Sequence, residues 1–503
     1  MSEKFTKKLS RRRFVALTGS AVAVGGLLAA CGDPTATTVP ATTAAPAATT
    51  AKATTAAAAP AATTASAATT AAATSAVATT AAPTATTASG TNLAVSKSGF
   101  KGTLEYWVLN YQPNNGNSTG ILMDAAVAVY TKANPDIKVS ITGYTGDQAG
   151  FTKLTQAVQG GQSVDMFRLP SDILPLLVKD GLVTPIDDFL TADDKADMYS
   201  SILDSVRVGG KAYAWPLWVP PVGMYLSLDV FKEKGVDLPK DTWTYEEFVD
   251  IAKKLTFTRA NGDKVYGYTG LIDPGVVNTW PFILGDGALP LNKDNTKYTF
   301  NSPEAISGLK KLVDLAQVHK VTPPDFGSQS GADITTAFKD KKLVAMYSEP
   351  SGASAGYKSD KLNFDVRGMP IGKGGKPVTA GGIGLISVAA IKDKAKLQAA
   401  MDLGRYLTSG QVAQDVPPSS ETGKASGFYL APGARKSVKV VDPINKFDAL
   451  VPVCYITPII ADWPAIRTII HPNIQNAVFG KLTPEQALNG PAKEIDDILA
   501  KSK

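Results

Sequence analysis

The strongest constraint on the fold is a regular alternation of short apolar runs with amphipathic stretches, which begins at Leu104. The strands that it predicts are 104–109, 137–141, 165–169, 212–216, 343–348 and 385–389, and the helices are 121–133, 151–159, one opened by the Thr244/Glu247 capping box, and 303–317. Such alternation predicts an α/β fold built on parallel sheets. The alternating part has roughly 405 residues, which is long for one domain and comfortable for two.

A tract of Ala, Thr, Pro and Ser precedes this part, from Pro34 to about Thr91, with Lys52 as its single charge. Because the tract cannot bury enough large apolar surface to offset its ordering entropy, we expect a disordered stalk. An Ala-rich helix is the alternative, but Thr-Thr pairs and recurrent Pro oppose it. As a flexible coil the stalk would reach on the order of 40 Å and act as a tether.

The first thirty residues predict export, because a basic start is followed by the apolar run from Phe14 to Ala30. The segment Ser10-Arg11-Arg12-Arg13-Phe14-Val15 is similar to a twin-arginine signal, with ordinary secretion as the alternative. A transmembrane anchor is disfavoured, since the run is rich in Gly and shorter than the roughly twenty residues that a span needs.

The apolar run ends in Leu28-Ala29-Ala30-Cys31-Gly32, which resembles the lipobox of bacterial lipoproteins. The resemblance implies cleavage after residue 30, so that 1–30 is the signal peptide and Cys31 carries the lipid. Residues 31–95 then form the lipidated N-terminus and the stalk. We expect the protein to be lipid-anchored to the cell membrane, facing the periplasm or the extracellular side.

Charge and cysteine content exclude several classes of partner. The chain has 51 Lys and Arg against 45 Asp and Glu, and removal of the leader with its six basic residues and Glu3 leaves 45 against 44. This near-neutral balance predicts no nucleic-acid partner. If Cys31 carries lipid, Cys454 has no partner within the chain, so the fold has to be stable without a disulfide, as a domain of this size can be.

Motifs for catalysis and cofactors are weak. The two histidines, His319 and His471, have no metal-ligand spacing, and no phosphate loop or dinucleotide fingerprint is present, so no metal and no cofactor is predicted. Gly352-Ala353-Ser354-Ala355-Gly356 matches the nucleophile elbow of serine hydrolases, but Glu349-Pro350-Ser351 intervenes after the strand. A small-residue loop is the favoured interpretation. Gly381-Gly382-Ile383-Gly384 predicts a close backbone approach or a hinge.

Aromatic residues suggest a cleft for a polar, ring-shaped ligand. Such a ligand needs flat apolar faces for its C–H surfaces and planar polar groups for its hydroxyls. Several tryptophans follow predicted strands, where ligands bind in open α/β sheets. The six are Trp107, Trp215, Trp218, Trp243, Trp280 and Trp463. Taken singly, each is more often a core residue than a ligand platform, and Trp243, directly before the capping box, is assigned to packing.

The order of segments after residue 100 resembles the family-1 extracellular solute-binding proteins of ATP-binding-cassette importers, of which the maltose-binding type is best known. The matching segments are 134–139 (Asn-Pro-Asp-Ile-Lys-Val), 165–167 (Asp-Met-Phe), 181–186 (Gly-Leu-Val-Thr-Pro-Ile), 211–216 (Lys-Ala-Tyr-Ala-Trp-Pro), 279–281 (Thr-Trp-Pro), 337–342 (Ala-Phe-Lys-Asp-Lys-Lys), 463–468 (Trp-Pro-Ala-Ile-Arg-Thr) and 480–488 (Gly-Lys-Leu-Thr-Pro-Glu-Gln-Ala-Leu). No segment is diagnostic alone, whereas eight in the family's order are.

The resemblance implies a two-lobed periplasmic-binding-protein-like fold of type II, with discontinuous lobes and a central ligand cleft. The expected N-terminal lobe comprises 96–220 with 370–412, and the expected C-terminal lobe comprises 221–369 with 413–503. The chain is expected to cross between the lobes at 218–225, 367–372 and 408–417. Ligand would stabilise a hinge closure by contacting both lobes.

The resemblance also implies binding residues. Trp463 matches a tryptophan that stacks on sugar in the maltose-binding type, and Asp172 matches an acid that binds hydroxyls. Two departures put maltodextrin in doubt, because Leu169 replaces an aromatic residue and the segment after strand 343–348 has no tryptophan. The remaining candidates are the aromatic residues Trp218, Tyr225 and Trp280 and the polar residues Asn110, Arg168 and Glu349.

These observations predict a monomeric binding protein, without catalysis of its own, that captures a sugar or oligosaccharide and delivers it to the permease of an ABC importer. Alternative ligands are a polyamine, a ferric complex or a glycerol-phosphate. Two other classes stay open at this stage, namely a surface-anchored serine hydrolase that uses Ser354 and a structural cell-surface protein without a small ligand.

Overall fold

The computed structural model describes residues 92–113, 118–145, 148–416, 432–440, 442 and 444–501, which belong to one compact unit, Thr86–Lys503. The predicted signal peptide, the lipidation site Cys31 and the stalk up to residue 91 lie outside the described residues. Within the described part, no helix is long and apolar enough to cross a membrane.

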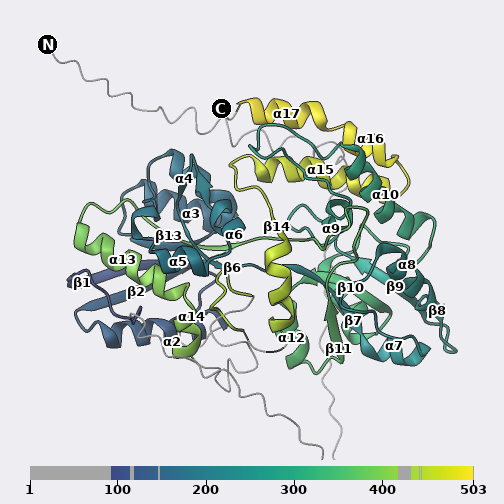
Figure 1. Cartoon of the computed structure of the whole chain (residues 1–503), viewed down its shortest axis with the longest axis horizontal. Coiled ribbons are helices and arrows are strands. Elements are labelled where there is room, and N and C mark those ends of the chain that lie inside the picture. The colour runs from purple at the N-terminus through teal and green to yellow at the C-terminus, as the bar shows by residue number, and fades with distance from the viewer. Residues whose placement is uncertain are drawn as a thin grey trace, which may run out of the picture. The chain divides into compact units, whose positions relative to one another are not determined.

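The first lobe is built on a five-stranded sheet with the order β2-β1-β3-β13-β6 (Figure 1). Its strands are β1 (Gly102–Leu109), β2 (Ile137–Tyr144), β3 (Met166–Pro170), β6 (Trp215–Trp218) and β13 (Gly384–Val388). Its helices are α2 (Ser118–Ala133), α3 (Gln148–Gln159), α4 (Leu174–Lys179), α5 (Ala192–Asp197), α6 (Ser200–Ser205), α13 (Lys394–Leu407) and α14 (Gly410–Asp415), with a small hairpin of β4 (Arg207–Val208) and β5 (Lys211–Ala212). α13 packs closely on the sheet, because a Cβ at Gly404 would lie 2.8 Å from the ring of Trp215.

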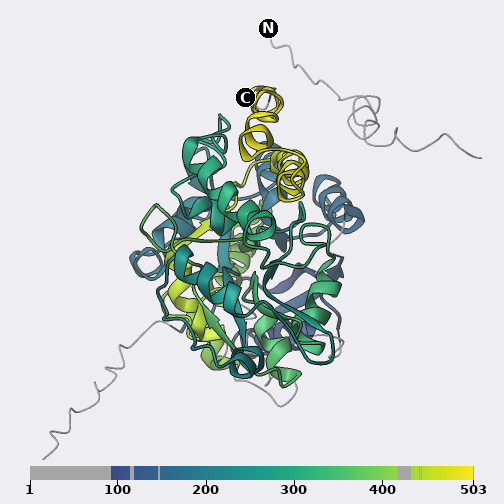
Figure 2. The ribbon, with the colours of Figure 1, turned by 90° about the vertical axis from the view of Figure 1, so that its right-hand side faces the viewer.

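The second lobe is built on another five-stranded sheet, with the order β11-β7-β10-β9-β8. Its strands are β7 (Val222–Ser227), β8 (Phe257–Thr258), β9 (Lys264–Gly270), β10 (Val344–Pro350) and β11 (Phe364–Arg367). Its helices are α7 (Leu228–Lys234), α8 (Tyr245–Lys254), α9 (Trp280–Leu284), α10 (Pro303–Gln317), α11 (Gly331–Thr335), α12 (Ala353–Ser359), α15 (Trp463–Val478), α16 (Pro484–Asn489) and α17 (Ala492–Lys501). Seen from the side of this lobe, α15 to α17 lie together at one end (Figure 2).

Local sequence explains several of these elements. The Thr244 hydroxyl and the Glu247 carboxylate cap the start of α8 reciprocally, as the capping box predicted. α10 spans Pro303–Gln317, the predicted bounds, with Ser302 as its N-cap and Pro303 in its first turn. The predicted strand 212–216 is instead two short strands, β5 and β6, because the chain turns at Tyr213 and Ala214.

The prediction of parallel sheets is only partly right. β1 pairs in parallel with β2 and β3, and β10 pairs in parallel with β9. β13, however, runs antiparallel to both β3 and β6, and β10 runs antiparallel to β7. The reversal follows from the topology, because β13 enters the first-lobe sheet from the second lobe and not through a helix of its own lobe.

Three segments carry the chain between the lobes. The first is 219–221, between β6 and β7, inside the predicted segment 218–225. The second follows β12 (Thr379–Gly381) at 382–383, and the third is formed by β14 (Cys454–Ile456) and the residues after it. β12 and β14 pair in parallel, and Gly381 also forms a bridge with Pro221, so the three segments meet.

The packing moves two of the predicted lobe boundaries. Ala380 belongs to the core of the second lobe, whereas Val416, Ala434 and Ile444 belong to the core of the first lobe. The predicted crossings at 367–372 and 408–417 are therefore wrong. The described residues 413–416 and 432–440 stay with the first lobe, and the helix Ile444–Val453 before β14 packs against both lobes, with Ile444 in the first-lobe core and Phe447 against Tyr225 of the second. The reason is a buried ion pair between Arg435 and Asp194 of α5, with N–O distance 2.7 Å, which holds the segment 432–440 on the first lobe.

We predict that Asp194→Ala strongly destabilises the first lobe. Asp194 and Arg435 are 3% and 2% exposed, so loss of the Asp194 carboxylate removes the near counter-charge of a buried guanidinium and leaves it only Asp197, at 3.8 Å. Such a loss costs roughly 3 to 5 kcal/mol. Urea denaturation followed by tryptophan fluorescence measures the effect, and Asp497→Ala, which removes an exposed pair with Lys493, is the control with little change. An Asp194→Ala protein with the wild-type midpoint would contradict the assignment.

Candidate functional site

The carboxyl ends of the main strands of both sheets lie next to the crossing segments. β6 ends at Trp218, directly before the first crossing, and β3 runs parallel to β6 because both are antiparallel to β13. In the second lobe, β7 begins directly after this crossing, and Pro350 at the end of β10 pairs with Val222 at the start of β7. Ligands of open α/β sheets bind at carboxyl ends of strands. The two edges are therefore the candidate binding surfaces.

On the first lobe, the edge carries a stacked pair, Arg168 and Trp218. Arg168 is on β3, and its guanidinium carbon lies 4.2 Å from the centroid of the Trp218 ring. The ring rests on β13 at Gly384, where a Cβ would lie only 2.5 Å from Nε1 of Trp218. Gly384 is thus required for the indole to lie against the sheet, and two candidates named from the sequence come together here.

The Arg168 guanidinium is electrostatically costly. Burial lowers the pKa of Arg168, while the nearby Tyr106 and Tyr144 act in the opposite direction. Among the described residues, no acidic side chain forms an ion pair with it, and the cation–π contact returns about 2 kcal/mol at most. Arg168 is only half-buried, but no carboxylate among the described residues compensates for the partial desolvation of its charge. The Tyr106 hydroxyl, which acts on the pKa of Arg168, is also buried and has no partner among the described residues.

On the second lobe, Glu349 ends β10 within a group of tyrosines. The Tyr357 hydroxyl of α12 donates to Glu349 Oε2 at 2.5 Å. Burial raises the pKa of Glu349 to about 7, although hydrogen bonds from Tyr357 and Tyr347 work against the rise. A carboxyl group with this pKa exchanges a proton near neutral pH and can either donate or accept a hydrogen bond from a hydroxyl ligand.

Tyr225, predicted as a platform, is instead a core residue. It is fully buried on β7, in edge contact with Tyr357 at 5.4 Å between ring centroids. Its hydroxyl donates to the Pro350 carbonyl at 3.1 Å and lies 2.7 Å from the Ser354 hydroxyl. Because β7 is a central strand covered on this face by α12, the ring has no free surface for a ligand.

Trp463 and Trp280 are also buried, at 0% and 1% exposure, and form part of the second-lobe core. Their rings are in edge contact at 5.9 Å, and Trp280 stacks on His471 at 5.4 Å. Neither ring has an exposed face on which a sugar could stack. The family resemblance had implied such a face for Trp463. The indole N–H of each, however, has no acceptor within the described residues, so each retains an unused donor.

The last two predicted residues lie at the first-lobe edge. Asn110 directly follows β1, is exposed, and has a left-handed backbone with φ of 56°. Its backbone N–H donates to the Tyr144 carbonyl at 2.7 Å. Asp172 lies in a short 3-10 helix after β3, Ser171–Ile173, but its side chain is outside the described part of the structure.

Sequence reasoning missed two polar residues of the second-lobe edge. Asn278, before α9, and Ser351, after β10, are 2% and 0% exposed, and the Asn278 Oδ1 and Ser351 Oγ atoms have no partner among the described residues. Buried polar groups are normally hydrogen-bonded, so unpaired ones at a strand edge are typical of a binding surface. Their positions in the sequence could have indicated them, because the Asn directly precedes the Thr-Trp-Pro segment and the Ser directly follows β10.

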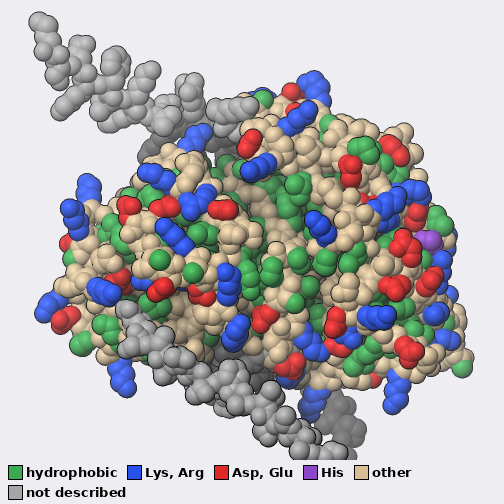
Figure 3. Space-filling view, in the orientation of Figure 1, with side chains coloured by type: hydrophobic (Ala, Val, Ile, Leu, Met, Phe, Trp, Pro, Cys, Tyr) green, Lys and Arg blue, Asp and Glu red, His purple; other side chains and the backbone are tan. Residues whose placement is uncertain are grey.

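The surface has two relevant hollows. A groove of about 320 Å³ lies between the lobes, lined by Arg207 of the first lobe, Asn292 of the second and the crossing residues 455–459. In the space-filling view, apolar side chains gather in the middle of the face, where the lobes meet (Figure 3).

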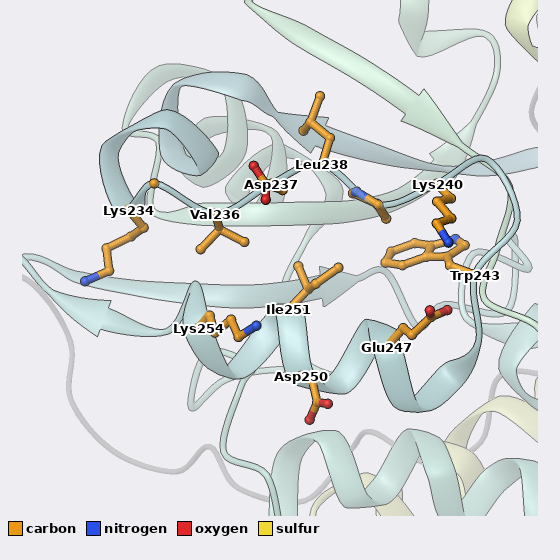
Figure 4. Close-up of a pocket in the computed structure, with 12 residues that line it drawn as sticks. Lys234, Val236, Asp237, Leu238, Lys240, Trp243, Glu247, Asp250, Ile251 and Lys254 are labelled. Atoms are coloured by element: carbon orange, nitrogen blue, oxygen red, sulfur yellow. The ribbon is translucent and has the colours of Figure 1, made fainter.

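A second groove, of about 800 Å³, lies on the second lobe between the segment after α7 and helix α8, with Trp243 at one end (Figure 4). None of the predicted binding residues lines it, and Trp243 is 2% exposed, as its assignment to packing implies. No group of His, Cys, Asp and Glu among the described residues could hold a metal ion.

Comparisons with known proteins agree with this architecture. A family model described as a bacterial extracellular solute-binding protein matches residues 125–416, more than half of the chain. The sn-glycerol-3-phosphate-binding periplasmic protein of Yersinia enterocolitica is 23% identical over 301 residues, which cover 55% of this chain and 64% of that relative, less than two thirds of its length.

Solved structures share the fold. The cyclic alpha-maltosyl-1,6-maltose binding protein of Arthrobacter globiformis superposes with a TM-score of 0.66 at 18% identity, covering 80% of this chain and 100% of that one. An ABC substrate-binding protein of Listeria monocytogenes in complex with cycloalternan gives 0.62 at 21% identity, with the same coverage. The two-lobed fold expected from the sequence is thereby confirmed.

We predict that Glu349→Gln removes a pH dependence of stability. A carboxyl whose pKa is raised from 4.5 to about 7 stabilises the fold fully below 4.5, and this contribution is lost as the pH rises through 7. Relative to the variant, the wild type should therefore lose about 2 kcal/mol between pH 5 and 8. Urea denaturation at several pH values measures it, with Glu246→Gln, an exposed carboxylate of α8, as the control. Parallel profiles for wild type and Glu349→Gln would refute the assignment.

Proposed function

We propose that this chain, which belongs to the family of bacterial extracellular solute-binding proteins, captures a sugar or oligosaccharide outside the cytoplasm and delivers it to an ABC importer. The ligand binds between the lobes, at the carboxyl edges of the two sheets, and the protein performs no catalysis on it. Capture draws the lobes together about the three crossing segments, because a ligand that touches both lobes favours the closed arrangement.

The observation that carries this proposal is the set of unused polar groups at both edges. In the first lobe these groups are the partly exposed Arg168 and the buried Tyr106 hydroxyl, and in the second they are the buried Asn278 and Ser351 and the titratable, partly exposed Glu349. A ligand with several hydroxyls can pair with donors and acceptors of this kind, each of which is costly while unpaired. The neighbour in complex with cycloalternan and the neighbour named as a cyclic alpha-maltosyl-1,6-maltose binding protein support a sugar, and the curated relatives support a glycerol-phosphate as the second candidate.

The alternative of a serine hydrolase that uses Ser354 finds no support. Ser354 is fully buried in α12 and lies 2.7 Å from the Tyr225 hydroxyl. Both ring nitrogens of His471 lie 3.0 Å from backbone carbonyls, of Arg467 and Val276, so the imidazole is already engaged there. A nucleophilic serine needs an exposed hydroxyl and a histidine within hydrogen-bond reach.

For the anchor, we predict that Cys31→Ala releases the protein from the membrane. The proposal assigns Cys31 the only lipid attachment, and the loss of acyl chains removes the apolar area that holds the chain to the bilayer. Fractionation of cells that express the wild type or the variant, followed by immunoblotting, measures the distribution. Wild-type and variant chains that both remain in the membrane fraction would refute the lipid anchor.

For the ligand, we predict a saturable thermal shift with at least one sugar, polyol or sugar derivative. The mature chain is screened with neutral and charged saccharides, glycerol-phosphates, polyamines and ferric complexes. Ligand at about a hundred times its Kd adds about 2.7 kcal/mol of stability. Trp218→Ala should abolish the shift, whereas Leu238→Ala, an exposed change in the α7–α8 groove, should preserve it. A shift lost only in Leu238→Ala would relocate the site and refute the proposal.

A further inference from the structure

Arg168 is a cation without an acidic partner. In the part of the chain that the structure describes, its guanidinium forms no hydrogen bond and no ion pair, and its carbon lies 4.2 Å from the centroid of the Trp218 ring. Five other arginines each have an Asp or Glu oxygen within 2.9 Å, namely Arg207, Arg259, Arg367, Arg405 and Arg435. Each of these five guanidinium groups thus has a carboxylate partner, whereas the guanidinium of Arg168 at the candidate binding edge has none among the described residues.

Among the side chains that the structure describes, none supplies a counter-charge to Arg168. Asp165, directly before β3, is held by Lys396 at 2.7 Å and accepts the backbone N–H of Glu105 at 2.7 Å. The ionisable groups that act on the guanidinium are the hydroxyls of Tyr106 and Tyr144. Both hydroxyls are protonated at neutral pH, as tyrosines ordinarily are, and burial raises the pKa of each still further.

A purely structural role does not account for this arrangement. An apolar side chain of similar length would cover the Trp218 ring without the desolvation of a charge, and replacement of buried charges by apolar residues is often neutral or stabilising. Binding sites often hold charged groups that lower the stability of the free protein. A ligand of opposite charge recovers that stability when it binds.

We propose that Arg168 binds a negatively charged group of the ligand, a phosphate or a carboxylate carried on a sugar or polyol. The proposal rests on the proposed function, and it narrows the ligand from neutral saccharides to anionic ones.

The geometry suits an oxyanion. Contact with Trp218 uses the face of the guanidinium and leaves the N–H donors at its edge, which match two oxygens of a phosphate or carboxylate. Trp218 rests on Gly384, so the stacked pair is backed by the sheet, and the cation is held in place before the ligand arrives. Asn278 Oδ1 and Ser351 Oγ are buried without a partner among the described residues, so a hydroxyl group of the same ligand reaches them only when the lobes are open.

The test compares matched ligands by isothermal titration with the mature full-length chain. The pairs are glycerol 3-phosphate with glycerol, glucose 6-phosphate and glucose 1-phosphate with glucose, and glucuronate and galacturonate with their hexoses. We expect at least one anionic compound to bind roughly 100-fold more tightly than its neutral partner. The sugar phosphates and the uronates show separately whether the anionic group of the ligand is a phosphate or a carboxylate.

Variants separate recognition from structure. Arg168→Met should weaken the anionic ligand roughly 100-fold while the unliganded protein melts at the same or a higher temperature. A structural role predicts a lower melting temperature instead. Lys179→Met, which removes an exposed cation of the same lobe, should leave affinity unchanged. If Arg168→Met fails to fold, the ligand pairs on the wild type still decide.

Two results would overturn the inference. Neutral compounds that bind as tightly as their charged partners would show that Arg168 does not recognise an anion, while the proposed function would stand. If none of these compounds and none of the neutral saccharides binds, the proposed function fails and this inference fails with it.

Discussion

The close meeting of the three crossing segments at Gly381 is the constraint on which the architecture depends. A Cβ at Gly381 would lie 2.7 Å from the Pro220 carbonyl oxygen and 3.0 Å from the Cys454 sulfur. No side chain fits there, so glycine is what allows β12, β14 and the first crossing to touch. All three crossings meet at one place, and the carboxyl ends of β6 and β10 both adjoin the first crossing, because β6 ends at Trp218 and Pro350 pairs with Val222.

The chemistry of the site follows from this arrangement. Each lobe stabilises itself by burying aromatic residues such as Tyr225, Trp280 and Trp463, which are therefore occupied in packing and not in recognition. What remains at the edges is polar and incompletely paired, notably Arg168 on the first lobe and Asn278 on the second. Neither lobe satisfies these groups alone. A ligand that contacts both edges supplies the missing hydrogen-bond and ion-pair partners. Because it contacts both edges at once only in the closed arrangement, its binding free energy also favours closure.

Much of the fold was predictable from the sequence, because the spacing of apolar residues and the capping of helices depend only on residues close together in the chain. The α10 bounds and the α8 capping box are examples, and the family resemblance supplied the two lobes. The position of the third crossing was not predictable, since the buried Arg435–Asp194 pair, whose members are 241 residues apart, keeps the segment 432–440 on the first lobe. Of the predicted site residues, Arg168, Trp218 and Glu349 lie at the sheet edges, and their role in binding a ligand stays a prediction. Tyr225, Trp280 and Trp463 were misjudged as stacking platforms, because a sequence does not reveal which aromatic faces the packing covers.

The most direct test of the central claim is a crystal structure of the mature protein with the ligand that the binding screens identify. We predict density for the ligand between the two carboxyl edges, with contacts to Arg168 and to the Asn278–Ser351 edge, and lobes that rotate about 219–221, 382–383 and the segment after β14. A ligand found in the α7–α8 groove, or bound to one lobe with no contact to the other, would contradict the account.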